Sequence, residues 1–385
     1  MPGDQLRNQS GLQYLRRILT LALFCFVLAG CTVRPAESPE IRALLPIEAV
    51  DVHAVQANPD SVKPDISDKG VVSILALSGG GAEGAFGAGV LNGWSQSGSR
   101  PKFDIVTGVS TGALMATLAF LGPEYDRTLE HIYTTQTNEK IFRERGAAGL
   151  LSDSLYDIGP LKQQIEDHVD AVLVAKIAAE HKKGRRLYVA TTNLDAGELV
   201  VWDMGAIAVG NRFNPVQMFQ KVLRASTAIP GFFQPVYIKP KKGVQLRQAH
   251  VDGGVKAPVL LSDFLFRSPA KKRELYVIIN DQLRLRSEHT AVKGELADIA
   301  RKSIFELMRE LLYNTVYQGY VRSRNSGTTF GLLAIPDSFP ASTKSLDFDP
   351  KRMRALFSLG QKLGRSRSFS KEPPRLQKFD RVVRR

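Results

Sequence analysis

Apolar runs separated by glycine-rich or polar turns recur along the chain from residue 71, and their lengths alternate between those typical of strands and of helices. The run 71–77 is almost continuously apolar and predicts a buried strand. Further strands are predicted at 104–107, 187–192, 199–202, 275–279 and 330–335. Helices are predicted at 84–94, 112–121, 293–319 and 349–363. This alternation predicts the α/β class, with helices on both faces of one sheet.

The first thirty residues have a different pattern, with arginines ahead of a short apolar stretch, 18–27, that ends in small residues. The stretch is too short to cross a bilayer and indicates a signal peptide, 1–30. Its end, Leu28-Ala29-Gly30-Cys31, resembles a bacterial lipobox, which implies cleavage before Cys31 and lipidation of that cysteine. A plain secretory signal or a short membrane anchor is the alternative.

Residues 31–69 carry several prolines and predict a tether between the lipid and a domain at 70–365. By resemblance to a bacterial sorting rule, Thr32 after the cysteine implies the periplasmic face of the outer membrane as the location of the protein. The membrane is therefore an expected partner.

The net charge of +14 is concentrated at the end of the chain, where residues 351–385 hold twelve Lys or Arg against Glu372 and Asp380. A charge confined to one tail argues against a nucleic-acid-binding face on the domain. The predicted helix 349–363 either lies on an anionic membrane or packs on the domain with a solvated basic face. Residues 366–385 are predicted to be a disordered basic tail.

Ser110 lies in Gly108-Val109-Ser110-Thr111-Gly112, between a predicted strand and an apolar helix. The Gly-x-Ser-x-Gly pattern seats a nucleophilic serine on a tight strand-to-helix turn, where the two glycines let strand and helix approach without side-chain collision. A serine hydroxyl needs a base and oxyanion donors before it attacks a carbonyl. The pattern also fits an ordinary turn in which Ser110 or Thr111 caps the helix.

A second glycine cluster, Gly79-Gly80-Gly81 with Gly84 three residues later, follows another predicted strand. Its backbone N–H groups are candidates for an oxyanion hole, because glycines let several N–H groups converge on one oxygen. The spacing also matches a dinucleotide-binding fingerprint, which needs an acidic residue at the end of the next strand. Here that strand ends on Ser110, so we favour the oxyanion hole.

The base that activates the serine is not an evident histidine. His289 alone follows the other candidates in α/β-hydrolase order, and its surroundings are polar; His250 would share a face with Asp252 on an extended segment. Asp252, followed by Gly253 and Gly254, is the better candidate, because partial burial beside the serine would raise its pKa. A simple Asp-Gly-Gly turn is the alternative.

In this order and spacing, the three motifs around Gly79, Ser110 and Asp252 resemble the patatin-like phospholipases, as does the segment 223–236. The resemblance implies a three-layer α/β/α sandwich with a mostly parallel central sheet. It also implies a Ser–Asp dyad without a catalytic histidine, in which Ser110 is the nucleophile, Asp252 the base and the Gly79–Gly81 backbone the oxyanion hole. The substrates implied are acyl esters of phospholipids or related lipids, and the sequence indicates no cofactor and no metal site.

Glu83 departs from the pattern of this family, whose glycine loop usually carries Arg or Lys at that position. A carboxylate pointing at an oxyanion would oppose it, so we expect Glu83 to point to solvent or to a basic partner. Two other functions stay open: acyl transfer by the same dyad to an acceptor other than water, and a non-catalytic envelope lipoprotein that keeps the fold as a binding module.

Overall fold

The structure is a computed structural model that describes residues 49–51, 70–146, 152–210, 214–239, 247–267, 270–283, 296–340 and 346–374. The chain divides after Ala43, and all these residues belong to the unit Leu44–Arg385. The predicted signal peptide, Cys31, Thr32 and most of the predicted tether lie outside the described residues, as does His289.

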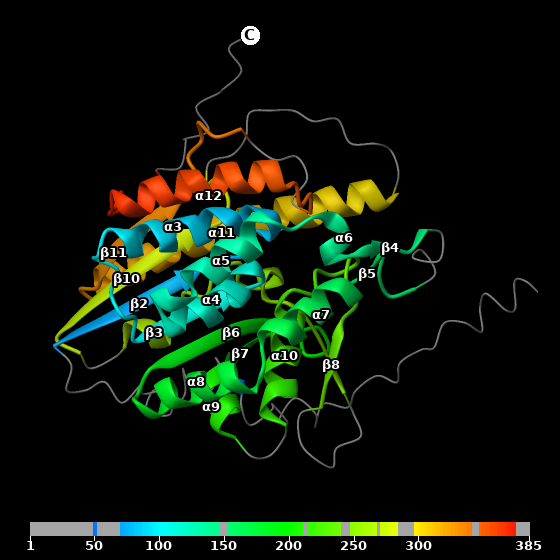
Figure 1. Cartoon of the computed structure of the whole chain (residues 1–385), viewed down its shortest axis with the longest axis horizontal. Helices are drawn as coiled ribbons and strands as arrows, with labels where there is room; N and C mark the ends of the chain where they lie inside the picture. The colour runs from blue at the N-terminus through cyan, green and yellow to red at the C-terminus, as the bar shows by residue number, and fades with distance from the viewer. Residues whose placement is uncertain are drawn as a thin grey trace, which may run out of the picture. The chain divides into compact units, whose positions relative to one another are not determined.

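One central sheet forms on the apolar runs that the sequence predicts (Figure 1). In the described residues its strands are β1 (Ala49–Asp51), β2 (Val71–Leu77), β3 (Ile105–Val109), β6 (Arg186–Asn193), β7 (Glu198–Asp203), β8 (Val236–Ile238), β9 (Gln248–Asp252), β10 (Lys272–Ile279) and β11 (Thr329–Ala334). They run in the order β1-β7-β6-β3-β2-β10-β11, while β9 also pairs with β6, and β8 with β9. The inner pairs from β6 to β11 are parallel, and β6 and β7 pair antiparallel.

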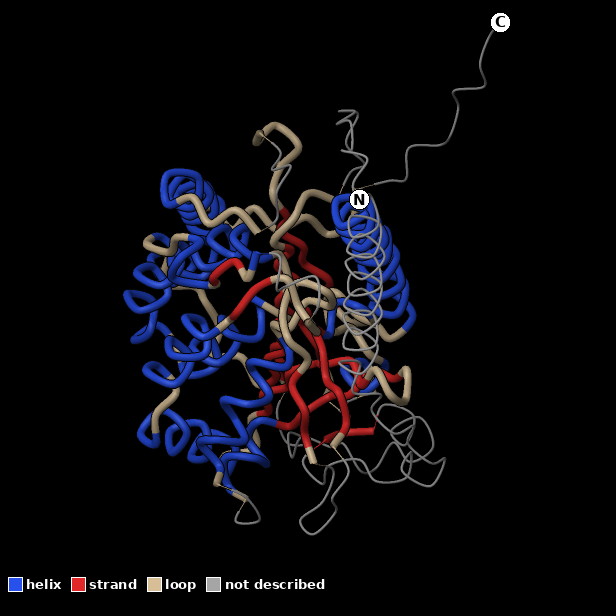
Figure 2. The backbone as a smooth tube through the Cα atoms, turned by 90° about the vertical axis from the view of Figure 1, so that its right-hand side faces the viewer, coloured by secondary structure: helices blue, strands red, loops and turns tan. Residues whose placement is uncertain are grey.

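Helices cover both faces of this sheet (Figure 2). They are α3 (Gly84–Gln96), α4 (Thr111–Leu121), α5 (Asp126–Thr134), α6 (Asn138–Ile141), α7 (Gly159–His168), α8 (Ala171–Lys182), α9 (Met204–Val209), α10 (Pro215–Ser226), α11 (Leu296–Asn325) and α12 (Pro350–Arg365). Successive residues of β2 point to opposite faces: Leu75 and Leu77 join one core cluster, and Ile74 and Ala76 the other. The predicted three-layer α/β/α fold is confirmed. A small hairpin, β4 (Arg143–Glu144) with β5 (Tyr156–Asp157), lies outside the sheet.

The C-terminal helix α12 packs directly on α3 because glycines remove the side chains between them. A Cβ atom added at any of these glycines would collide with a backbone carbonyl of the facing helix. They are Gly89 and Gly93 on α3, and Gly360 and Gly364 on α12. Asp349 caps α12 by accepting hydrogen bonds from the Lys351 and Arg352 N–H groups. The predicted helix 349–363 therefore packs on the domain, and its contact with α3 fixes the position of its first turn.

Two segments differ from their predicted roles. Ala49–Asp51, within the range predicted as tether, pairs as an edge strand with β7. Ser370 forms a β-bridge with Leu332, and the Phe369 ring lies 4.6 Å from that of Trp94. Residues 366–374 are therefore ordered, which corrects the prediction that disorder begins at residue 366. The physical reason is that the Phe369 ring packs against aromatic side chains of the domain. Residues 375–385 lie outside the described residues.

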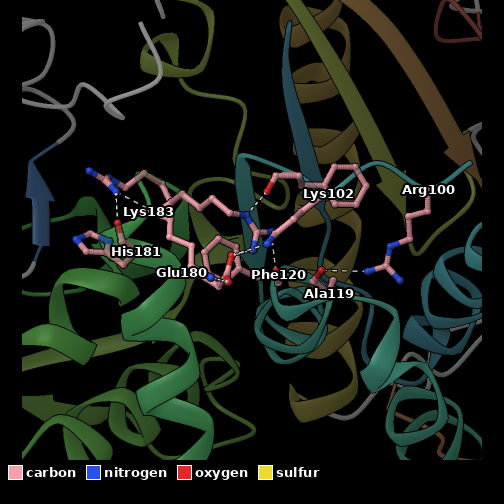
Figure 3. A network of polar contacts seen from close by, with 10 residues as sticks. Arg100, Lys102, Ala119, Phe120, Glu180, His181 and Lys183 are labelled. Carbon is pink, nitrogen blue, oxygen red and sulfur yellow. Dashed lines mark hydrogen bonds and ion pairs between the residues drawn. The ribbon is translucent and has the colours of Figure 1, made fainter. Parts of the chain in front are cut away.

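Two arginines bind the C-terminal end of α4, and Figure 3 labels one of them, Arg100, with Ala119 and Phe120. Arg185 donates to the Phe120 carbonyl at 2.6 Å, and Arg100 to the Ala119 carbonyl at 3.0 Å. Arg185 is itself ion-paired to Glu180 at 2.7 Å. Cations at a helix C-terminus satisfy its free carbonyls and complement its dipole. They fix the helix whose other end carries Ser110.

Candidate active site

Ser110 occupies the turn between β3 and α4 in a backbone conformation that side-chain-bearing residues rarely adopt, with φ 56° and ψ −128°. The flanking glycines make this turn possible. A Cβ at Gly112 would lie 2.5 Å from the Ser78 carbonyl oxygen, and one at Gly108 would meet the Gly112 carbonyl. Strain of this kind persists where the surrounding structure enforces it. The strand–serine–helix turn that the sequence predicts is therefore present, and its hydroxyl is available for chemistry.

Strand β6 brings Ser110 and Asp252 together. Its edge first pairs with β3, which ends with Val109 opposite Ala190. The next residue of the same edge, Thr191, pairs with Asp252 at the end of β9. Because β3 runs parallel and β9 antiparallel to β6, the two strands run toward each other along the same edge of β6, and their last residues are adjacent. The sequence predicts both residues, and the structure places them in one site.

Asp252 is fully buried, and its two carboxylate oxygens are in different surroundings. Oδ1 accepts the Gly254 N–H at 2.7 Å, while Oδ2 has no hydrogen bond of ordinary length from the described residues. Burial raises the pKa of Asp252 to about 6, and interaction with the Ser110 side chain and the Gly254 N–H limits the rise. Gly253 also has to be glycine, because a Cβ there would lie 2.6 Å from the Ala190 carbonyl oxygen. A carboxyl group with this pKa is suited to exchange a proton near neutral pH.

The last residue of α10 and the segment that follows it bind the backbones of Ser110 and Asp252, a role that sequence reasoning missed. The Ser226 hydroxyl accepts the Ser110 N–H at 3.0 Å and donates to the Ala190 carbonyl at 2.8 Å. Two residues later, the Ala228 carbonyl accepts the Asp252 N–H at 2.8 Å. The only signal in the sequence was that 223–236 resembles a family segment. Its physical role is to tie the two strand ends together.

The glycine loop lies beside Ser110, but one of its predicted oxyanion donors is occupied. The Gly79 N–H donates to the Pro258 carbonyl at 3.0 Å, which corrects the assignment of that group to the oxyanion hole. Gly80 and Gly81 have positive φ angles of 152° and 55°. Both line the same cavity as Ser110 and Asp252. The candidate oxyanion donors are therefore the N–H groups of Gly80 and Gly81.

Two buried residues brace this loop. Asn280, at the end of β10, donates its side-chain N–H to the Ser78 carbonyl and accepts the Gly87 N–H. Gly84 lies so close to α4 that a Cβ there would come within 2.6 Å of the Thr111 hydroxyl. These contacts hold the loop and the serine turn at a fixed separation. Nothing in the sequence pattern pointed to Asn280.

Two cavities meet at Ser110. The first, the apolar cavity, has about 940 Å³ of open space, and its walls include Leu114, Leu118, Ile165, Leu173, Leu223 and Phe233. The second, the polar cavity, has about 740 Å³ and contains Asp252, Gly80 and the side chain of Arg309. Both share Gly81, Ile229 and Leu346 with Ser110. An ester bound across the junction would have one side in each cavity.

The patatin-like phospholipase family model matches residues 75–265, a range that contains the glycine loop, Ser110 and Asp252. This domain belongs to the patatin-like phospholipase family. The range matched by the family model contains all three motifs of the predicted site.

The patatin-like domain has curated relatives in Escherichia coli. The cGAMP-activated phospholipase of strain TW11681 is 27% identical over 204 residues, covering 49% of this chain and 54% of the relative. A cUMP-AMP-activated phospholipase is 35% identical over 94 residues, covering 24% and 29%. The chain thus spans about half the length of the first relative and less than a third of the second. VipD from Legionella pneumophila aligns with 77% of this chain and 66% of its own at 13% identity and a TM-score of 0.40, too low to carry an argument.

The departure of this patatin-like domain from its family at Glu83 has a structural counterpart. Glu83 is buried, and the Arg352 guanidinium on α12 binds it through Nε at 3.0 Å and Nη2 at 2.9 and 3.2 Å. Arg352 also donates to the Pro340 carbonyl and lies over the Phe339 ring. Of the two expectations, the basic partner is confirmed. The carboxylate is turned toward a cation 269 residues away in sequence.

His250 lies in the interior of the patatin-like domain. It is fully buried, and its Nδ1 lies 3.0 Å from the Thr191 hydroxyl, which accepts the Trp202 indole N–H. Burial, with Lys221 nearby, lowers the pKa of His250 to about 3, so the ring is neutral at physiological pH. Within the described part of the chain, no histidine hydrogen-bonds to Ser110 or Asp252.

Proposed function

We propose that the domain hydrolyses acyl esters of phospholipids with a Ser–Asp dyad. The observation that carries the proposal is the meeting of β3 and β9 along β6, which puts Ser110 beside a buried carboxyl group at the junction of two cavities. The apolar lining of the first cavity suits a fatty acyl chain, while the polar cavity takes the alcohol side of the ester. The family assignment supports the same substrate class.

In the first half of the reaction, the Ser110 Oγ attacks the carbonyl carbon while its proton passes to the Asp252 carboxylate. The carbonyl oxygen becomes an oxyanion, which the N–H groups of Gly80 and Gly81 stabilise. The intermediate then collapses, and the C–O bond to the alcohol breaks. The departing alkoxide takes the proton from Asp252, which leaves an acyl ester on Ser110.

In the second half, Asp252 accepts a proton from a water molecule that attacks the acyl carbon. The same N–H groups hold the second oxyanion, and its collapse returns the proton to the Ser110 oxygen and releases the fatty acid. Each half of the reaction returns Asp252 to its ionised form, so the dyad needs no further base. A nucleophilic alcohol in place of water would give acyl transfer, which product analysis distinguishes.

Fluorophosphonate labelling tests the proposal directly. We expect the probe to label the wild-type protein on Ser110, the Ser110→Ala variant to stay unlabelled, and the Ser366→Ala variant, changed at an exposed serine, to label like wild type. Mass spectrometry of phospholipid incubations should show free fatty acid that disappears with Ser110→Ala. An unlabelled wild-type protein that releases no fatty acid would favour the binding module, and acylated alcohols in place of fatty acid would favour transfer.

We also propose that lipid on Cys31 holds the domain at the periplasmic face of the outer membrane, next to its substrate. The lipobox-like sequence is what supports this proposal. As a separate finding, none of the described helices is long and apolar enough to span a bilayer. Cells fed labelled palmitate should incorporate label into wild-type protein and into Cys25→Ala, whose cysteine leaves with the signal peptide. Cys31→Ala should take up no label and leave the membrane fraction; retained label would exclude this anchor.

A further inference from the structure

Helix α11 supplies one whole wall of the polar cavity. Phe305, Met308, Arg309 and Leu312 all line it, with spacings of three, four and seven residues that put them on one helix face. This helix lies beyond residues 75–265, the range that matches the family. The wall is therefore a feature of this chain that its family motifs do not describe.

Arg309 is partly buried, and its partners in the described residues leave one of its N–H donors without an acceptor. Its side chain is 14% exposed, and its Nε atom makes no hydrogen bond with the residues that the structure describes. The Asp281 carboxylate is 3.9 Å from Nε, and Glu306 accepts from Nη1 only at 3.3 and 3.4 Å. A guanidinium has five N–H donors in a planar fork, and a donor that is shielded from solvent without an acceptor, as the Arg309 Nε–H is, is unfavourable. The group is suited to a further anionic acceptor.

The charged side chains that line the two cavities indicate which residue could bind an anionic group of a substrate. Among the residues that the structure describes, Arg309 is the only lysine or arginine that lines either cavity. At the glycine loop the residue is Glu83, and its carboxylate is already bound by Arg352. A phosphate on the alcohol side of the substrate, next to Ser110 and Asp252, would thus meet one guanidinium, that of Arg309.

We propose that the polar cavity is the head-group subsite and that Arg309 binds the phosphate of the leaving alcohol. Two N–H groups of a guanidinium match two phosphate oxygens, so one arginine both neutralises and orients the group. The preference of the enzyme for phospholipids over neutral glycerolipids then depends on a helix outside the family motifs. This inference rests on the proposed hydrolase function, with the acyl chain in the apolar cavity.

The test compares a phospholipid with a diacylglycerol of the same acyl chains, each in mixed micelles. We expect Arg309→Met to lower the ratio of the two kcat/KM values at least tenfold, and Arg309→Lys to keep part of the preference. Arg324→Met, at an exposed arginine on the same helix, should leave the ratio at the wild-type value. A ratio within twofold of wild type in Arg309→Met, or a wild-type enzyme with no preference for the phospholipid, would overturn the proposal.

A binding measurement separates this inference from the proposed function. Calorimetric titration with glycerol 3-phosphate needs no turnover; we expect affinity at least fivefold weaker in Arg309→Met than in wild type or Arg324→Met. Equal binding by all three proteins overturns the subsite even if wild type hydrolyses lipids. Loss of binding confined to Arg309→Met in a protein that hydrolyses neither lipid would sustain the subsite and reject the hydrolase. Unchanged melting temperatures exclude unfolding as the cause.

Discussion

Replacing Asp252 by asparagine is expected to abolish hydrolysis and at the same time to stabilise the protein at pH 8. The amide has nearly the shape of the carboxyl group and keeps an oxygen for the Gly254 N–H, but it cannot take the proton from Ser110. Loss of a positioned base costs roughly 1,000-fold in kcat. The stabilisation follows from burial, because the charged form of Asp252 is the one that folding disfavours.

The direction of this effect with pH can be derived from the pKa. The pKa of Asp252 rises from 3.8 to about 6 on folding, so the native state binds the proton more tightly than the unfolded state. The resulting penalty is absent well below pH 4, grows between pH 4 and 6, and is complete above pH 6, where it is on the order of 2–3 kcal/mol. Wild-type kcat/KM should accordingly rise with pH through about 6, as the base loses its proton.

Urea unfolding at pH 8 and at pH 4, together with rates on a short-chain ester, measures both effects. The Asp252→Asn variant should unfold at higher urea than wild type at pH 8 and at nearly the same urea at pH 4. Asp167→Asn, which changes an exposed carboxylate, should alter neither stability nor rate appreciably. A variant that keeps more than a hundredth of the rate, or an equal gain in stability at both pH values, contradicts the role given to Asp252.

Sequence patterns predicted the parts of this site that lie in contiguous motifs. The glycines at 108 and 112 are needed for a local steric reason, and the apolar runs indicate buried strands. The serine turn and most of the sheet were therefore predictable. Ser226, Asn280 and Arg352 were not, because each acts through a contact more than a hundred residues away in sequence. Such pairings depend on strand register and helix docking, which periodicity does not determine. Gly79 failed as a donor for the same reason, since its partner Pro258 is equally remote.

The Glu83–Arg352 pair shows how a change in a motif can be balanced from elsewhere in the fold. Glu83 lines the polar cavity two residues from Gly81, so an uncompensated charge there would oppose the oxyanion in the transition state. Arg352 cancels it, and the glycine contacts of α12 with α3 hold Arg352 in place. The neighbouring Met353 lines the apolar cavity. The C-terminal helix thus contributes a lining residue to the apolar cavity and the partner of Glu83 to the polar cavity.

Reversing the charge of Arg352 is expected to lower kcat at least about 100-fold, because Arg352→Glu puts two carboxylates together beside the glycine loop and leaves the charge of Glu83 uncompensated. The double variant Glu83→Arg/Arg352→Glu restores an ion pair and places a cation in the glycine loop, so it should recover most of the rate. Arg354→Glu changes an exposed arginine two residues further along α12, and its kcat should stay near the wild-type value.

The comparison of kcat with KM makes this test specific. An effect on the oxyanion appears in kcat for short and long acyl esters alike, whereas displaced cavity walls would raise KM chiefly for the long ones. Circular dichroism confirms that each variant is folded at the assay temperature. If the double variant is no more active than Arg352→Glu, or if Arg354→Glu loses as much activity, the pair does not act by neutralising Glu83. Recovery in the double variant alone would show that the two charges act as a unit across the interface between α12 and the glycine loop.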